Sequence, residues 1–481
     1  MATLTEAHAI LDALTKELAS RQSEIETLDQ AYRGKFALEF ASDDFDEYFA
    51  AQYAGFSDNW TQVVADAPHE RLEITGIRHD GAEKGDGDLW KRWLENEADA
   101  YSDLAFLDAI IAKRSFALVW GNSDDEAVVT WEHPSQAIVG YDPETRKRAG
   151  GAKIWSDDKH DFATLYLPDE VWKFQRARGM AGRRASGLIV AGSVSPGGWE
   201  PRQPAGDDTW PLPNPLGEVS MVELQNKPRL IGEPMSDISG TLSMQHAINL
   251  IWAQLFAVID ERALSARVIT GAERPTVPVL DDNGQQIGTK PVDLKKIRRN
   301  RTLWLENPAA KIDEWGAASF DGFTSIIDKA VGHISSQSRT PATYFMGGGS
   351  TIANVGDDSL VPLETGLVMR TREKTQHFGR SAREVFRLMA LAESEKGKAA
   401  SVATGTVLWR DIESRSDAQR TDALQKKSAI GYPFRYILEL DGLSDPEIDR
   451  VMDMVDAEAS DPLLSAALGE IVKPANAGDR E

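Results

Sequence analysis

Apolar residues at helical spacing mark the start of the chain. An apolar or aromatic residue stands at every seventh position through four heptads, and this spacing predicts one long helix over residues 4–32. The positions are Leu4, Leu11, Leu18, Ile25 and Tyr32. Because four heptads are few for a free coiled coil, we expect an amphipathic helix packed against a globular body.

The next part of the chain mixes strand and helix patterns. Residues 72–77 alternate between apolar and polar, residues 115–120 are rich in β-prone side chains, and residues 127–176 predict several short strands separated by turns. Between these strands, residues 89–111 carry apolar side chains at helical spacing. Residues 177–215 are rich in Gly, Pro, Arg and Ser and predict a long loop.

Two helices are predicted on either side of a small β module. Residues 236–264 keep an apolar stripe through Ile248, Ile251 and Leu255, and residues 319–338 do so through Ile326 and Ile327. Between them, an Asn-Gly pair at 283–284 joins two β-prone runs, which is a strong signal for a hairpin. A further strand is expected at 301–305.

The last third begins with a Gly-rich segment and continues as helices. Residues 339–358 contain three consecutive glycines at 347–349 and predict a flexible loop. A long helix is expected over 360–392, a strand at 407–409, an acidic helical region over 411–470 and a disordered end at 471–481. The pattern as a whole predicts a mixed α+β fold.

Composition narrows the possible classes of protein. The chain has 481 residues and no cysteine, which excludes disulfides, thiolate metal sites and cysteine nucleophiles. Its net charge of −23 argues against a protein that grips DNA tightly through phosphate contacts. The N-terminus lacks the pattern of a signal peptide. No uninterrupted apolar run is long enough to span a membrane, since Asn249 and Gln254 break the most apolar helix at 247–259.

Motifs that would indicate an enzyme are incomplete. The segment 347–351 has the glycines and hydroxyls of a phosphate-binding loop but no lysine, and no two of the eight histidines have the spacing of a zinc-binding helix. Adjacent carboxylates such as Asp281 and Asp282 are expected by chance in so acidic a chain, and solvated loop charge is the better interpretation. We therefore predict no catalytic residue, no metal site and no cofactor.

A single dense group of basic residues lies in the β module. Contact with an acidic partner or with phosphate is favoured for it over a merely solvated face, because the rest of the chain is so acidic. The group is Lys290, Lys295, Lys296, Arg298, Arg299 and Arg301.

Short patterns spread over residues 30–455 resemble the actinophage-type portal proteins of tailed bacteriophages, with the Gp6-like portal fold. They include Tyr53–Phe56 with the segment 70–77, Leu89–Asn96, Tyr141–Pro143, Ser236–Ile238 with 247–249, and the C-terminal segments 423–431 and 439–448. The order and spacing of these patterns carry the resemblance more than any one of them does.

The resemblance implies an elongated portal-type subunit of a ring oligomer, usually with twelve copies. Carried onto this chain, it implies an N-terminal helix at 1–35, an α/β wing at 36–235 and 360–410, stem helices at 236–265 and 319–338, a clip at 266–318, a tunnel loop at 339–359 and a crown or C-terminal region at 411–481. The stem residues would include Ile248, Ile251, Leu255, Ile326 and Ile327, and the clip would present the basic group to partners. The tunnel-loop residues facing DNA would be Arg339, Thr340, Tyr344, Gly347, Gly348, Gly349, Ser350, Thr351 and Asn354.

The partners implied by the resemblance are those of a virion assembled in the host cytoplasm. They are other copies of the chain, the terminase large subunit, the head-tail adaptor, the major capsid and scaffold proteins, and double-stranded DNA passing without sequence specificity. A non-enzymatic portal at a capsid vertex is the favoured interpretation. A minor head protein is the first alternative, and a nuclease holding Mg²⁺ between Asp and Glu pairs is a remote one.

Overall fold

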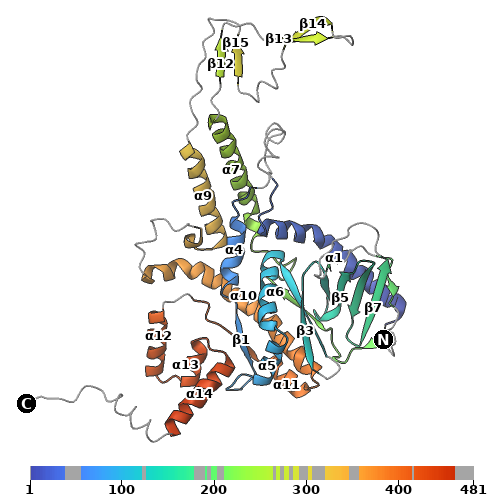
Figure 1. Cartoon of the computed structure of the whole chain (residues 1–481). Helices are drawn as coiled ribbons and strands as arrows, with labels where there is room; N and C mark the ends of the chain where they lie inside the picture. The colour runs from blue at the N-terminus through green and yellow to red at the C-terminus, as the bar shows by residue number, and fades with distance from the viewer. Residues whose placement is uncertain are drawn as a thin grey trace, which may run out of the picture. The chain divides into compact units, whose positions relative to one another are not determined.

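The chain folds as two units, each built from segments that are far apart in the sequence (Figure 1). The computed structural model describes residues 2–37, 56–121, 126–177, 190–191, 197–202, 211–263, 267–270, 276–280, 285–291, 302–305, 320–345, 357–413 and 417–460. Unit 1 comprises Met1–Gly34, Asn59–Leu242 and Ile334–Glu481, and unit 2 comprises Lys35–Asp58 and Ser243–His333. Most of the predicted loop at 177–215 and all residues after 460 lie outside the described residues.

The N-terminal helix of unit 1 covers an antiparallel sheet. Helix α1 (Leu4–Tyr32) starts at a capping box formed by Thr3 and Glu6, and it buries Leu11, Leu14 and Leu18 in one core with side chains of the sheet. This confirms the predicted amphipathic helix. The sheet has the order β10-β7-β6-β5-β4, with β8 added beside β5 and β9 beside β7. Its strands are β4 (Ala137–Tyr141), β5 (Arg148–Ser156), β6 (His160–Tyr166), β7 (Glu170–Ala177), β8 (Val190–Ala191), β9 (Glu200–Pro201) and β10 (Leu212–Pro213).

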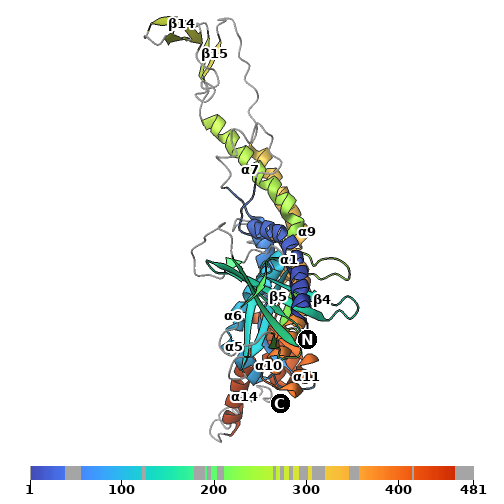
Figure 2. The ribbon, with the colours of Figure 1, turned by 90° about the vertical axis from the view of Figure 1, so that its right-hand side faces the viewer.

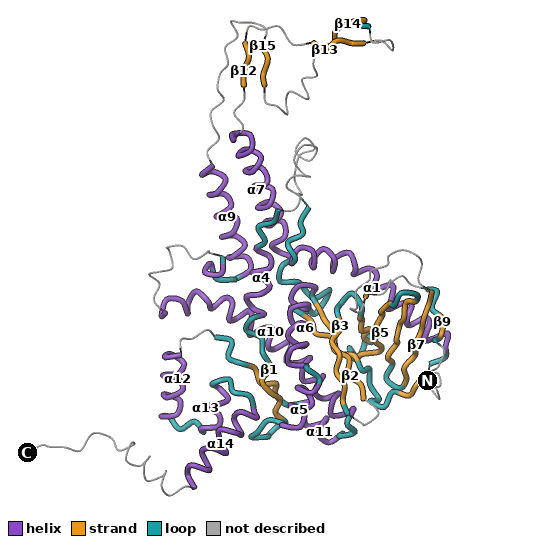
Figure 3. The backbone as a smooth tube through the Cα atoms, in the orientation of Figure 1, coloured by secondary structure: helices purple, strands orange, loops and turns teal. Residues whose placement is uncertain are grey.

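A second sheet of unit 1 is contacted by one helix from the first third of the chain and one from the last third (Figure 3). It has the order β11-β2-β3, formed by β2 (Arg114–Gly121), β3 (Ala127–Glu132) and β11 (Met221–Gln225). Helices α6 (Ala98–Ala112) and α10 (Asp357–Ala392) both contact β2, and the rings of Phe106 and Phe378 stack between them with centroids 5.2 Å apart.

The predicted helical stretch at 89–111 is two helices. Helix α5 (Gly87–Glu95) ends before α6 because Glu97 adopts a left-handed conformation with φ of 51°, which no α-helix accommodates. Nearby, α4 (Trp60–His69) contacts α1, α6 and α10. The short helices thus fill the space between the long ones.

Unit 1 is closed by pairing between its first strand and its last. Strand β1 (Ile74–Arg78) pairs antiparallel with β16 (Thr406–Trp409), which follows α11 (Lys396–Ala403). The chain continues into α12 (Asp417–Ala429), α13 (Phe434–Leu440) and α14 (Asp445–Ser460). These helices are tied back to β1 by an ion pair of 2.8 Å between Arg78 and Glu439.

Unit 2 contains most of two helices and two small sheets. A 3-10 turn (Ser239–Thr241) leads into α7 (Leu242–Ala263), and α9 (Phe320–Ser338) returns to unit 1. The predicted hairpin is confirmed by antiparallel pairing of β13 (Thr276–Leu280) with β14 (Gln286–Pro291), while the connecting residues lie outside the described part. Strand β12 (Arg267–Thr270) pairs in parallel with β15 (Thr302–Leu305).

Polar side chains of α7 hold an extended segment of unit 2. The Asn249 side chain accepts a hydrogen bond of 3.1 Å from the backbone N–H of Asp58, and the indole of Trp252 donates one of 2.9 Å to the Asp58 carboxylate. Among the described residues, one helical segment, at 239–259, is long and apolar enough to cross a membrane by length and composition. Because Gln245 and Asn249 are buried and hydrogen-bonded within unit 2, the segment also fits a helix that packs against protein.

Candidate functional site at the ends of the two long helices

A buried carboxylate stands in unit 1 directly before the start of α7. Asp237 has a fully buried side chain, and its oxygens lie 2.8 Å from Lys227, 2.8 Å from Lys374 and 3.0 Å from Arg370. The side-chain amide of Asn226 donates a further hydrogen bond of 2.9 Å to it. Burial alone would raise the pKa of Asp237, but the three cations hold it well below its usual range. The residue is therefore charged at any pH at which the protein functions.

Two of the three cations of this cluster come from one face of α10. Arg370 and Lys374 are four residues apart, so their side chains project to the same side of the helix. Both are buried, and burial lowers the pKa of Lys374 to about 8 against the opposing charge of Asp237. Three cations and one carboxylate leave this site with an excess of positive charge, so it depends on Asp237 for its stability.

Arg370 links the cluster to the end of α9. Its guanidinium donates hydrogen bonds to the backbone carbonyl of Ser338 and to the Thr340 hydroxyl, the latter at 3.0 Å. It also donates to the backbone carbonyl of Val64 on α4. One side chain therefore holds the start of α7, the end of α9 and α4 in fixed relation within unit 1.

The turn after α9 is shaped by close backbone packing. Arg339 has φ of 55°, in the left-handed region, and its carbonyl oxygen would lie 3.3 Å from a Cβ atom placed at Gly366 of α10. Thr340 is 2% exposed, and its carbonyl accepts a hydrogen bond of 2.8 Å from the Ser335 hydroxyl. The turn thus has little freedom to move.

A second arginine holds the residues that follow this turn. Arg71 donates a hydrogen bond of 3.0 Å to the Tyr344 hydroxyl and forms an ion pair of 3.2 Å with Glu364. The next residue, Phe345, is buried with its ring centroid 5.6 Å from that of Trp60. The segment 346–356, which lies outside the described residues, therefore starts from an anchored position.

Only some of the predicted site residues lie in the described part of the structure. Of the predicted tunnel-loop residues, Arg339 is exposed, Thr340 is buried and Tyr344 is hydrogen-bonded, so the last two serve as anchors in this structure. Gly347, Gly348, Gly349, Ser350, Thr351 and Asn354 lie outside the described residues.

The predicted clip and stem residues are similarly divided. Lys290 is exposed on β14, whereas Lys295, Lys296, Arg298, Arg299 and Arg301 lie outside the described residues. Of the stem residues, Ile248, Leu255 and Ile327 are buried, Ile251 is half-buried and Ile326 is 54% exposed.

The buried cluster at Asp237 was not predicted from the sequence. A signal for it exists in α10, where Arg370 and Lys374 fall on the same stripe as the buried Leu367, Thr371 and Phe378. Charged residues on an otherwise buried stripe require a partner, since an unpaired buried charge is strongly unfavourable. The partner residues, Asn226 and Asp237, are too distant in sequence to be identified by spacing.

The chemistry of the cluster is structural. Within the described ranges, no group of three or more His, Cys, Asp or Glu side chains is arranged to hold a metal ion. The cluster instead joins the ends of two helices that flank a β module.

Comparison with known proteins gives the family. Residues 11–458 match the family described as phage portal protein, SPP1 Gp6-like, and the chain therefore belongs to this portal family. The predicted resemblance is confirmed.

Individual relatives carry the same name. The chain is 23% identical to the portal protein of Mycobacterium phage D29 over 76% of this chain and 71% of that protein. It is 22% identical to the portal protein of Mycobacterium phage L5, with the same shares covered. Among solved structures, it matches a chain in the neck of an empty GTA particle computed with C6 symmetry at a TM-score of 0.37 and 11% identity, covering 80% of this chain and 88% of that one.

Proposed function

We propose that copies of this chain form a closed ring, usually of twelve subunits, at one vertex of the capsid. The ring is the channel through which DNA is packaged and later ejected. Membership of the phage portal family over residues 11–458 is the observation that carries this proposal. A contact between different faces of identical subunits closes into such a ring when the rotation between neighbours divides the circle.

The parts of the portal subunit are assigned along the chain as the family resemblance implies. Residues 36–235 and 360–410 form the wing, 236–265 and 319–338 the stem, 266–318 the clip, 339–359 the tunnel loop and 411–470 the crown region, after the N-terminal helix at 1–35. The two helices and the β pairs between them support this division, because α7 and α9 flank both small sheets of unit 2.

The tunnel loop contacts DNA lightly and without reading sequence. Between Arg339 and Arg370 the sequence contains neither arginine nor lysine and is rich in glycine. Few phosphate contacts are therefore available there. The net charge of −23 suits a wall along which DNA slides. The anchors at Thr340 and Tyr344 set the start of the loop. The DNA-facing surface is assigned to Arg339 together with Gly347, Gly348, Gly349, Ser350, Thr351 and Asn354.

The clip docks the terminase during packaging and the head-tail connector afterwards. Its basic group supports contact with acidic surfaces of these partners. The energy for DNA movement comes from the partner motor, and the portal itself is structural, without catalytic residues or cofactor. Capsid and scaffold proteins hold the ring at its vertex.

Light scattering combined with negative-stain imaging of the purified full chain tests the ring. A particle near twelve times 52.9 kDa with a central hole is the expected result. A protein that stays monomeric with and without scaffold would contradict the ring and favour a minor head protein. Chelator-sensitive cleavage of DNA by a compact dimer would instead indicate a nuclease.

The clip assignment has its own test. Reversal of Lys295, Lys296, Arg298 and Arg299 to Glu is expected to leave rings intact and to reduce binding of the terminase and the connector. Failure of the rings themselves would show that these residues lie elsewhere than in a projecting clip.

A further inference from the structure

A basic groove lies in unit 1 where the turn between β4 and β5 meets α10. Its volume is about 620 Å³, and its lining includes Arg146 and Lys147 of the turn and Arg380 of α10. All three side chains are exposed, and among the described residues none of them has a carboxylate within ion-pair distance. In a chain of net charge −23, three unpaired cations around one hollow are unusual.

The acidic residues of the groove are already engaged. Glu223 forms an ion pair of 3.0 Å with the buried Arg114, and Glu384 forms one of 2.7 Å with Arg387. Glu218 lies within 3.5 Å of Arg148. Each of these carboxylates is neutralised by its own arginine. The groove therefore presents the positive charge of the three exposed cations, together with that of the half-buried Arg383, which donates a hydrogen bond of 3.3 Å to the Gly405 carbonyl.

An acidic face lies on another part of unit 1. It surrounds a hollow of about 430 Å³ lined by residues of α4, α5 and α6, and it includes the exposed Glu70 and Asp99. Within the described ranges, neither of these two carboxylates has a cation within ion-pair distance. The same holds for the carboxylate of Glu97, which lies between α5 and α6. The acidic face therefore carries charge opposite to that of the groove.

Exposed apolar side chains accompany this acidic face. Leu94 is 43%, Tyr101 48% and Leu104 55% exposed, all on α5 or α6. A tyrosine and two leucines bordered by carboxylates resemble the composition of a protein interface, in which an apolar centre has a polar rim. The lining of the basic groove offers some apolar surface in turn, from the half-buried Pro168 and Pro228.

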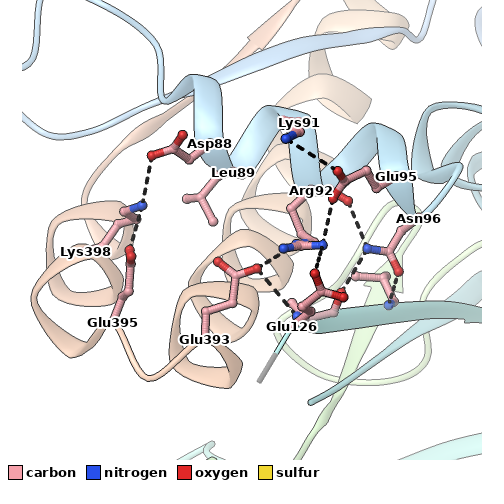
Figure 4. Close-up of polar contacts among 12 residues, drawn as sticks. Asp88, Leu89, Lys91, Arg92, Glu95, Asn96, Glu126, Glu393, Glu395 and Lys398 are labelled. Atoms are coloured by element: carbon pink, nitrogen blue, oxygen red, sulfur yellow. Dashed lines mark hydrogen bonds and ion pairs between the residues drawn. The ribbon is translucent and has the colours of Figure 1, made fainter. Parts of the chain in front are cut away.

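The two surfaces belong to different sides of unit 1. Figure 2 shows α5 and α6 along one side of this unit and β4 and α11 along the other. Helix α5 is fixed to the frame by Arg92, which lies 2.8 Å from Glu393 and 3.2 Å from Glu126 (Figure 4). The Asn96 side chain adds hydrogen bonds with the backbone of Ala127 and Val129 in β3. The acidic face is therefore presented by a firmly held helix.

We propose that the acidic face of one copy docks against the basic groove of the next copy. The inference rests on the proposed ring and names the surfaces that form it. Opposite charges on opposite sides of a subunit give a head-to-tail contact and disfavour the pairing of two identical faces, because like charges would then meet. A second copy of this chain is the occupant that fits, since it carries the complementary surface itself.

Paired charge reversals of the full chain test this interface. The groove variant is Lys147→Glu with Arg380→Glu, and the face variant is Glu70→Lys with Asp99→Lys. A control variant, Lys16→Glu with Lys159→Glu, makes the same change in net charge as the groove variant at exposed positions outside both surfaces. Circular dichroism and thermal melting establish that each variant is folded, and ring content is measured by light scattering and negative-stain imaging.

Each reversal alone is expected to lower the ring fraction by about tenfold or more, since like charges then face each other at every contact. An equimolar mixture of the groove and face variants is expected to restore rings, because alternating copies again pair opposite charges. The control variant is expected to form rings as the wild type does.

The outcomes separate this inference from the proposed function. Two results would overturn the interface and leave the portal ring standing. In the first, the wild type forms rings and both reversals form them equally well. In the second, the mixture of folded variants fails to restore rings. A wild-type chain that never forms rings would overturn the proposed function, and the interface with it. If the groove variant is unfolded, Lys147→Gln with Arg380→Gln takes its place. A ring fraction at low salt equal to that of the wild type would then count against the interface.

Discussion

Replacing Asp237 with asparagine removes the only carboxylate that contacts Arg370 and Lys374 among the described residues. The asparagine side chain has nearly the same shape, so the change isolates the charge. Removing one partner of a buried ion pair typically costs about 3–5 kcal/mol, because the other charge is left uncompensated. We expect the free energy of unfolding of unit 1 to fall by an amount in this range at pH 7.

Lys374 can lose its proton, and the free energy needed to remove that proton is the most that Lys374 can add to the loss of stability. From the ordinary pKa of 10.5, folding with a neutral lysine at pH 7 costs about 4.8 kcal/mol, at about 1.36 kcal/mol per pKa unit. At pH 9 the same step costs only about 2.0 kcal/mol. The destabilisation by Asp237→Asn must therefore depend on pH.

The sign of this dependence follows from proton binding. The folded pKa of Lys374 is lowered to about 8, so above this pH the unfolded chain binds more protons and stability rises with pH. In the Asp237→Asn variant, Lys374 is expected to be neutral in the folded state already at pH 7. The rise in the free energy of unfolding therefore begins at a lower pH in the variant than in the wild type. The difference in unfolding free energy between variant and wild type should narrow by about 1.4 kcal/mol between pH 7 and pH 9.

Urea unfolding followed by circular dichroism at both pH values measures these differences. The matched control is Asp441→Asn, which removes a partly exposed ion pair of 2.7 Å with Arg420 and should cost less than about 1 kcal/mol. Adding Lys374→Met to Asp237→Asn should recover part of the loss. A loss for Asp237→Asn no larger than that of the control, or one independent of pH, would refute the account of the cluster as a charge-compensated anchor.

Three further changes test other parts of unit 1 by thermal melting. Gly366→Ala should lower the melting temperature, because the added Cβ would lie 3.3 Å from the Arg339 carbonyl oxygen. The control Gly397→Ala on α11 places a Cβ with nothing within 4 Å, and it should raise the free energy of unfolding by about 0.5–1 kcal/mol. Equal effects at both positions would count against tight packing after α9. Thr3→Ala should cost about 1 kcal/mol by removing the capping box of α1, and Thr27→Ala, within the same helix, serves as its comparison. Phe378→Ala should cost about 3–5 kcal/mol, since this fully buried ring stacks on Phe106; a loss below 1 kcal/mol would show that the stack is dispensable.

Elements with a continuous local pattern were predicted well from the sequence. The predicted helix at 319–338 is α9 (Phe320–Ser338), and the one at 360–392 is α10 (Asp357–Ala392). Their apolar stripes repeat over several turns, so periodicity alone identifies them. The hairpin at β13 and β14 was predicted from its Asn-Gly pair, because that turn chemistry is local.

Features that depend on distant contacts were not predictable in the same way. The parallel pairing of β12 with β15 joins strands separated by more than thirty residues, and no turn signal specifies it. The break between α5 and α6 at Glu97 lies inside a stretch whose apolar spacing continues through it. The basic groove likewise combines a hairpin turn with a helix more than two hundred residues later, so only the folded chain brings Lys147 and Arg380 together.

The buried cluster explains how two helices of a portal subunit can be coordinated at their ends. Asp237 immediately precedes the turn into α7 and Ser338 ends α9, and Arg370 contacts both residues. Displacement of either helix end would therefore strain the same guanidinium, which cannot lose its charge to relieve the strain. The loop after Phe345 starts from residues that Arg71 and Arg370 hold, and it ends at α10, the helix that carries Arg370. Phe345 and the start of α10 are therefore held by the same pair of arginines, Arg71 and Arg370, as a fixed frame on either side of the segment between them.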